Sequence, residues 1–224
     1  MHPRRGGTAP PRGFAEHGNW RNAAMITLHL TRADDYAGVY LPLPATPAEI
    51  GEAWAELDHI SGDVASTRIV GAISNVWGIG QYLKNADVNT SGQFEKLNRI
   101  AELTGSLDRH QCHIFEGALN AESVNSLDDV IAIGERLEQY LLLSGVNTDR
   151  ELGAYLVETG VMPFEDSVQP YLDYAKIGIE YYSNHGGAYA TGGYVLRRES
   201  AEQALLDIAD SSQNRQTPGG MEMG

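Results

Sequence analysis

The feature that most constrains the fold is a strongly marked helix start set among strand-like segments near the N-terminus. The residues TPAE (46–49) combine an N-cap threonine, a proline at the first helical position and the glutamate of a capping box, and they predict a helix over about 47–60. Alternating apolar residues predict strands in MITLHL (25–30) and GVYLPL (38–43), joined by a turn near Asp34 and Asp35, and in STRIVGAI (66–73). We expect these segments to form a small β-β-α-β module with an antiparallel sheet.

The rest of the chain is predicted to be mainly helical, with a mixed C-terminal part. Helical spacing of apolar residues, with caps at Thr90 and Thr148, predicts helices over about 90–105, 107–119, 127–141 and 148–160. The stretch 163–198 is rich in Tyr and Gly, ends in the strand-like YVLRR, and precedes a predicted helix over 201–209. The fold class is therefore α+β, in an elongated chain of small modules. Their predicted bounds are 1–24 (disordered leader), 25–90 (α+β), 91–145 (helical), 146–210 (α+β) and 211–224 (disordered tail).

The charge of the chain favours basic partners. It has 30 Asp and Glu against 16 Lys and Arg, a formal charge of −14, while its first 22 residues hold four Arg and one acid. Such a chain lacks the basic footprint of a direct nucleic-acid or anionic-membrane binder. Cys112 is the only cysteine, and no apolar run approaches the roughly 18 residues of a membrane span, so we expect a cytoplasmic protein.

The motifs that carry catalytic chemistry elsewhere are incomplete in this sequence. NVWGIGQYL (75–83) resembles the start of a dinucleotide-binding turn, but Leu83 replaces the third glycine, so a helix-capping turn is favoured. His110, His113 and Glu116 share one helical face, yet no second ligand pair completes a metal cage. We therefore predict a non-catalytic protein without cofactor or metal, and keep a metal-dependent hydrolase at these three residues as a third hypothesis.

Three windows of the sequence contain acids and no Lys or Arg. They are residues 33–67 with seven acids, 110–135 with five and 151–175 with five. On the predicted 47–60 helix, Glu49, Glu52 and Glu56 form a row opposite Ile50, Trp54 and Leu57. An acidic solvated face is also ordinary for cytosolic proteins, so charge alone leaves both interpretations open.

Several longer strings resemble the ArdA-type antirestriction proteins of mobile elements in Gram-positive bacteria. They are LPATPAEI, STRIV, GQYLKNAD, FEKLNRIAEL, NSLDDV, ELGAYLVETG and, most specifically, YLDYAKIGIEYYSNHGGAYATGGYVLRR. The resemblance covers about residues 25–198, and the basic leader departs from it.

The resemblance implies an elongated homodimer that imitates bent B-form DNA and inhibits type I restriction-modification enzymes. An inhibitor of CRISPR effectors that uses the same acidic surface is the alternative. The acids of this sequence that would stand in for phosphates are Glu49, Glu52, Glu56, Asp128, Asp129, Glu135, Glu151, Glu158, Glu165, Asp166, Asp173 and Glu180. Asp173 and Glu180 have a second interpretation, as contributors to module packing or to the dimer contact.

Overall fold

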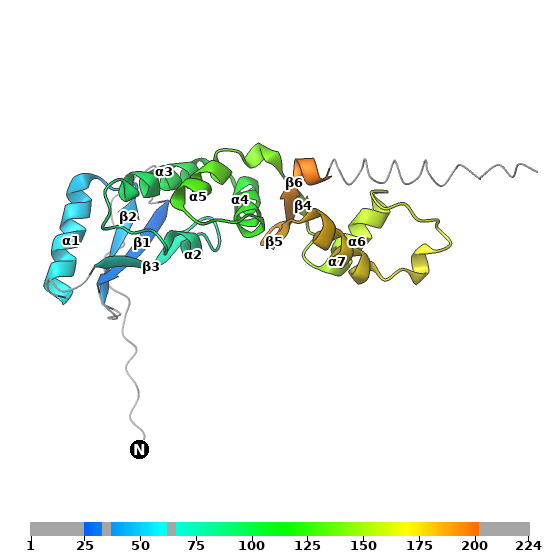
Figure 1. Cartoon of the computed structure of the whole chain (residues 1–224), viewed down its shortest axis with the longest axis horizontal. Helices are drawn as coiled ribbons and strands as arrows, with labels where there is room; N and C mark the ends of the chain where they lie inside the picture. The colour runs from blue at the N-terminus through cyan, green and yellow to red at the C-terminus, as the bar shows by residue number, and fades with distance from the viewer. Residues whose placement is uncertain (1–24, 33–36, 62–65, 202–224) are drawn as a thin grey trace, which may run out of the picture.

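The protein has a mixed α+β fold with two small antiparallel sheets, which confirms the predicted fold class (Figure 1). The computed structural model describes residues 25–32, 37–61 and 66–201. The predicted turn at Asp34 and Asp35, both predicted disordered ends and residues 202–209 of the predicted last helix lie outside these residues. Residues 198–201 are helical, just before that limit.

The first sheet and its helix match the predicted β-β-α-β module. Strands β1 (Ile26–Arg32), β2 (Gly38–Leu43) and β3 (Thr67–Ser74) lie in the order β2-β1-β3, and all pairs are antiparallel. Helix α1 (Pro47–Ser61) covers the sheet through buried Ala53 and Leu57, whereas Ile50 and Trp54 are only partly buried. The Thr46 side chain accepts a hydrogen bond from the Glu49 N–H, as the predicted capping box requires.

The middle of the chain consists of short helices, and one of them was predicted too long. The helices are α2 (Gly80–Leu83), α3 (Gln93–Ser106), α4 (Arg109–Ala121), α5 (Leu127–Gly134) and the 3-10 turn η2 (Leu137–Gln139). The predicted 127–141 helix is wrong beyond Gly134, because Tyr140–Ser144 forms strand β4. The predicted cap Thr90 is also wrong: Gly92 is the N-cap of α3, and the Thr90 hydroxyl donates to Asp87 instead.

The C-terminal part packs two helices against a second sheet. Strands β4, β5 (Ala188–Ala190) and β6 (Gly193–Arg197) lie in the order β4-β6-β5. Helices α6 (Asp149–Glu158) and α7 (Tyr174–His185) are joined by a loop that contains the 3-10 turn η3 (Gln169–Tyr171). Thr148 caps α6 as predicted, by accepting a hydrogen bond from the Glu151 N–H. Helix α7 was not predicted.

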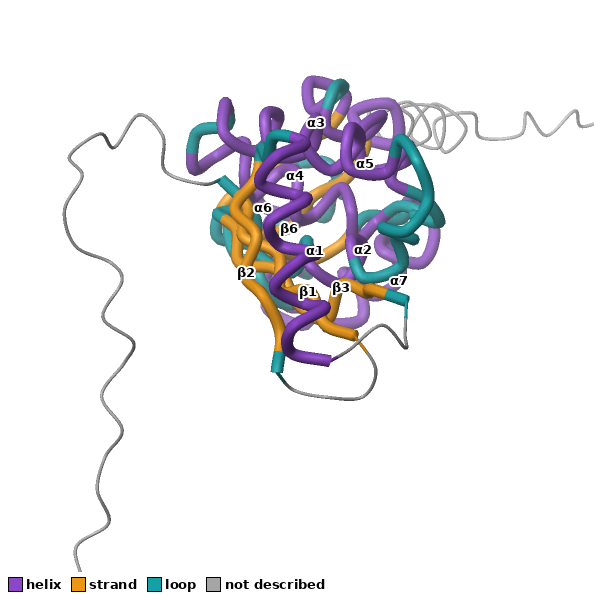
Figure 2. Tube along the Cα trace, turned by 90° about the vertical axis from the view of Figure 1, so that its left-hand side faces the viewer, coloured by secondary structure: helices purple, strands orange, loops and turns teal. Residues whose placement is uncertain are grey.

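The second sheet is shared by two hydrophobic cores. Leu142 and Val195 belong to the core that includes the first sheet and α4, while Leu143, Tyr194 and Leu196 belong to the core beneath α6 and α7. Successive residues of a strand point to opposite faces, so this sheet is buried on both sides. The body is consequently continuous and elongated in Figure 1, and Figure 2 shows its narrower profile from the α1 end.

Candidate acidic interaction surface

The first group of candidate acids lies on the exposed side of α1. Glu49, Glu52 and Glu56 are all exposed, opposite buried Ala53 and Leu57. The Glu49 carboxylate accepts hydrogen bonds from the N–H and the hydroxyl of Thr46, each at 2.7 Å, and the backbone bond is the main reason for its lowered pKa. Among the described residues, Glu52 and Glu56 have no such partner. They are therefore the members of the row most available to a cationic partner.

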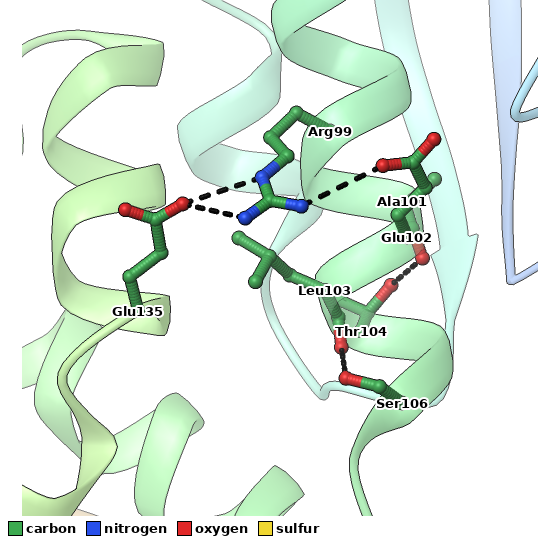
Figure 3. A network of polar contacts seen from close by, with 7 residues as sticks. All are labelled: Arg99, Ala101, Glu102, Leu103, Thr104, Ser106 and Glu135. Atoms are coloured by element: carbon green, nitrogen blue, oxygen red, sulfur yellow. Dashed lines mark hydrogen bonds and ion pairs between the residues drawn. The ribbon is translucent and has the colours of Figure 1, made fainter.

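The second group is largely neutralised by helix α3. Asp128 pairs with Lys96 at 2.6 Å, and Glu135 pairs with Arg99 at 2.8 Å. Figure 3 shows the Arg99 guanidinium between the carboxylates of Glu135 and Glu102. These exposed pairs contribute little to stability but cancel charge locally.

The third member of the central group, Asp129, has a local structural role. Its carboxylate accepts hydrogen bonds from the N–H groups of Asn125 and Ser126 at the start of α5, and these bonds, the Asn125 one first, lower its pKa. All three central candidates thus already have partners within the chain. The middle of the molecule offers fewer free carboxylates than its sequence indicates.

The third group surrounds α6 and α7, where acids outnumber bases clearly. Residues 149–185 contain seven Asp and Glu and two Lys and Arg. Some of these carboxylates are engaged: Glu151 accepts from the Asn147 N–H at 2.8 Å, Asp166 from the Gln169 side chain at 3.2 Å, and Asp173 from the Lys176 N–H at 3.2 Å.

The remaining C-terminal candidates are free of such contacts. Glu158, Glu165 and Glu180 are exposed, and within the described ranges their carboxylates have no hydrogen-bond or ion-pair partner. The hydrogen bond that Asp173 accepts from the Lys176 N–H makes Asp173 the N-cap of α7, and its alternative role in module packing or in the dimer contact stays a prediction. The free carboxylates of the predicted set are therefore at the two ends of the body, on α1 and around α6 and α7.

Exposed acids also lie outside the base-free windows, and Glu95 and Glu138 are two that the sequence windows did not identify. Glu95 on α3 and Glu138 in η2 are exposed, and their carboxylates have no partner in the part of the chain that the structure describes. The windows excluded them because Lys96 and Arg136 are close in sequence. In the structure Lys96 contacts Asp128 instead, and the Arg136 side chain donates to the Ala132 carbonyl. For Glu95, the signal was helical periodicity, which places neighbouring residues about 100° apart, whereas Glu138 lies in a 3-10 turn beyond the end of α5.

The three residues of the metalloenzyme hypothesis do not converge. His110 is exposed, the His113 ring lies against Gly192, and Glu116 is buried. The Glu116 carboxylate accepts hydrogen bonds from the N–H and the hydroxyl of Thr191, at 3.1 and 2.9 Å, and so ties α4 to the β5-β6 turn. Within the described residues, no group of three or more His, Cys, Asp or Glu could hold a metal ion. This arrangement gives Glu116 a structural task.

The glycine-rich turn after β3 is a close-packed turn next to an apolar hollow. Gly78 has a φ of 74°, and a side chain on Gly80 would lie 3.3 Å from the Ala72 nitrogen. A hollow of about 490 Å³ beside it is lined by β3, α2 and Trp77, whose side chain is 77% exposed. The positive φ explains the glycine at 78, and close packing explains the glycine at 80. Neither requires a bound nucleotide, which agrees with the capping-turn interpretation.

Comparisons with known proteins do not assign the chain to a family. No family model matches it, and no curated protein sequence matches it. In the described part of the chain, no helix combines the length and the apolarity needed to cross a bilayer. The structure therefore defines an α+β protein of two joined cores with free carboxylates at both ends.

Proposed function

We propose that the protein is an antirestriction protein of the ArdA type, a DNA mimic that binds type I restriction-modification enzymes in the bacterial cytoplasm. The strings that resemble this family, the formal charge of −14 and the elongated body support the proposal. It acts without catalysis or cofactor, as a homodimer, and its partner is a basic DNA-binding groove.

The observation that carries the proposal is the set of free carboxylates at both ends of an elongated, continuously packed body. The described residues hold 22 Asp and Glu against 11 Lys and Arg, so cations within the chain cannot neutralise the acids. Duplex DNA carries one charge per about 1.7 Å of its axis, and a binding groove for it is lined with Lys and Arg along its length. An elongated anionic protein fits such a groove better than a round one with the same charge.

The α1 row illustrates how a helix can replace part of a phosphate backbone. Glu52 and Glu56 are four residues apart, so they lie about 6 Å apart along the helix axis. Each can accept hydrogen bonds from an arginine of the partner, as a phosphate does. Binding of this kind gains rate from electrostatic steering and weakens as salt rises. It depends on backbone-like charge and not on bases, so enzymes with different recognition sequences are inhibited alike.

The test is competition with a DNA fragment for a purified type I restriction enzyme across a salt series. We compare the wild-type protein with E52Q/E56Q, and use E52D/E56D as the matched control because it keeps both charges. Glu49 is left intact since it caps the helix. The proposal expects competition that fades with salt, is weakened in E52Q/E56Q and is retained in E52D/E56D.

Two results would overturn the proposal. Absence of competition by the wild-type protein at every salt concentration would remove type I enzymes as the target, and the same assay with a CRISPR effector would then test the alternative. Inhibition that is insensitive to salt and equal in all three proteins would show that the acidic surface does not bind the enzyme.

A further inference from the structure

The loop between α6 and α7, residues 159–173, displays an apolar patch at one end of the molecule. Figure 1 shows this segment, named here the tip loop, projecting at the end of the body opposite α1. Three apolar residues in it are exposed, Tyr171 the most: Phe164 at 38%, Val168 at 43% and Tyr171 at 86%. Exposed apolar residues gathered in one segment are typical of an interaction surface.

The tip loop is held in a defined shape by its own contacts. The Val168 N–H donates to the Glu165 carbonyl at 2.9 Å, and the Tyr171 N–H donates to the Val168 carbonyl at 2.9 Å. These helix-like turns and the spacing of three residues place Val168 and Tyr171 on one side, and Phe164 lies just before the first turn. The other apolar residues of the loop, Val161, Met162 and Leu172, pack against the C-terminal core. These three packed residues hold the loop against the core.

The charge around the patch indicates what it can contact. The tip loop contains the carboxylates of Glu165, Asp166 and Asp173, and no Lys or Arg. Two copies of the loop placed face to face would bring these carboxylates together, which is unfavourable. A basic surface with an apolar hollow is complementary to both features, since it pairs with the carboxylates and covers the ring and the aliphatic side chains.

We infer that the apolar patch of Phe164, Val168 and Tyr171 anchors the protein in an apolar hollow within the basic surface of its partner. This inference rests on the proposed function and assigns a distinct part of the binding to this loop. Tyr is enriched among the residues that dominate interface affinity, because its large ring loses little conformational entropy when it is buried. The anchor supplies affinity that salt does not screen, whereas the carboxylates supply the salt-dependent part.

The inference is tested in the same competition assay with V168S/Y171S. We expect about tenfold weaker binding at every salt concentration, with an unchanged dependence on salt. E165Q/D166N should instead reduce the salt dependence. The matched control is W77S, which removes a comparable exposed aromatic side chain elsewhere and should leave affinity unchanged. Far-UV circular dichroism checks that each variant is folded.

Three outcomes would overturn the inference. If the wild-type protein competes and V168S/Y171S competes equally well, the patch is no anchor, while the proposed function stands. If the wild-type protein does not compete at any salt concentration, the inference falls together with the proposed function. If the wild-type protein self-associates in sedimentation and V168S/Y171S does not, the patch belongs to a contact between copies.

Discussion

Replacing Gly178 by alanine sets two opposite effects against each other in the C-terminal core. Alanine favours a helix interior over glycine by about 1 kcal/mol, so propensity alone predicts a more stable protein. In the structure, however, a Cβ at Gly178 would lie 2.8 Å from the carbonyl carbon of Asp149 and 3.1 Å from its Cα. These are backbone atoms of α6, which no side-chain rotation can move. The two helices must therefore separate.

The magnitude follows from comparing the two terms. Overpacking of a well-packed interface costs typically 1–3 kcal/mol, and contact with rigid backbone places this site near the upper end of about 3 kcal/mol. Subtracting the propensity gain leaves a net loss of about 2 kcal/mol. For a protein of this size that lowers the melting temperature by about 4–8 °C.

The assay is thermal and urea unfolding followed by far-UV circular dichroism, with G51A as the control. Gly51 lies on exposed α1, and nothing is within 4 Å of a Cβ placed there. G51A should therefore gain only the higher helix propensity of alanine and be more stable than the wild type by about 0.5–1 kcal/mol. If G178A were as stable as the wild type or more so, the close contact between α6 and α7 would not constrain the fold, and the reasoning would be refuted.

Three further changes test other contacts. Glu116→Ala should lower the free energy of unfolding by about 1–3 kcal/mol, because the N–H and hydroxyl of Thr191 lose their acceptor; an unchanged urea midpoint would contradict this. The hydrogen bond from Arg197 lowers the pKa of Glu122 below its ordinary 4.5, so the ionised carboxylate stabilises the fold above that pH and this contribution is lost as the pH falls through the lowered pKa. Glu122→Gln should accordingly cost more stability at neutral pH than in acid well below 4.5, and an equal cost in urea unfolding at both would refute the assignment. A double-mutant cycle on Lys96 and Asp128 should give a coupling energy below about 1 kcal/mol, since both side chains are at least a third exposed; a larger value would mean that the pair is more rigid than an ordinary surface pair.

The parts of the fold that were predictable are those determined by local chemistry. The TPAE signature of 46–49 specifies its own helix start through bonds between residues three apart, and Thr46 and Glu49 make them. Alternation identifies these strands because buried residues alternate with exposed or half-buried ones along β2 and along the first half of β1. In both cases the information lies within a few consecutive residues.

Strand β4 and helix α7 were not predictable because distant packing decides them. The apolar run around β4 has no alternation, since the sheet is covered on both faces, and such a run continues the helical pattern of α5. Helix α7 contains Gly178, which lowers helix propensity, and only the close approach of α6 explains its presence. In both cases the packing partners lie too far away in the sequence to be recognised from a few consecutive residues.

In the candidate acidic surface, too, local features were predictable and long-range contacts were not. Exposure of the acids was largely predictable, because helix positions opposite an apolar stripe face the solvent. The neutralisation of Asp128 and Glu135 was not, since their partners Lys96 and Arg99 precede them by 32 and 36 residues. Base-free sequence windows therefore identify acidic segments but overstate how many of their charges are free.

The sheet shared by the two cores determines how cooperatively the protein unfolds. Unfolding of α6 and α7 would uncover the Tyr194 and Leu196 side of that sheet, and unfolding of α4 would uncover the Val195 side. Unfolding of the elements around either core thus exposes apolar area on the sheet that both cores share. Partial unfolding therefore carries a free-energy penalty at this sheet. We expect one calorimetric transition with equal van't Hoff and measured enthalpies, as for a single cooperative unit.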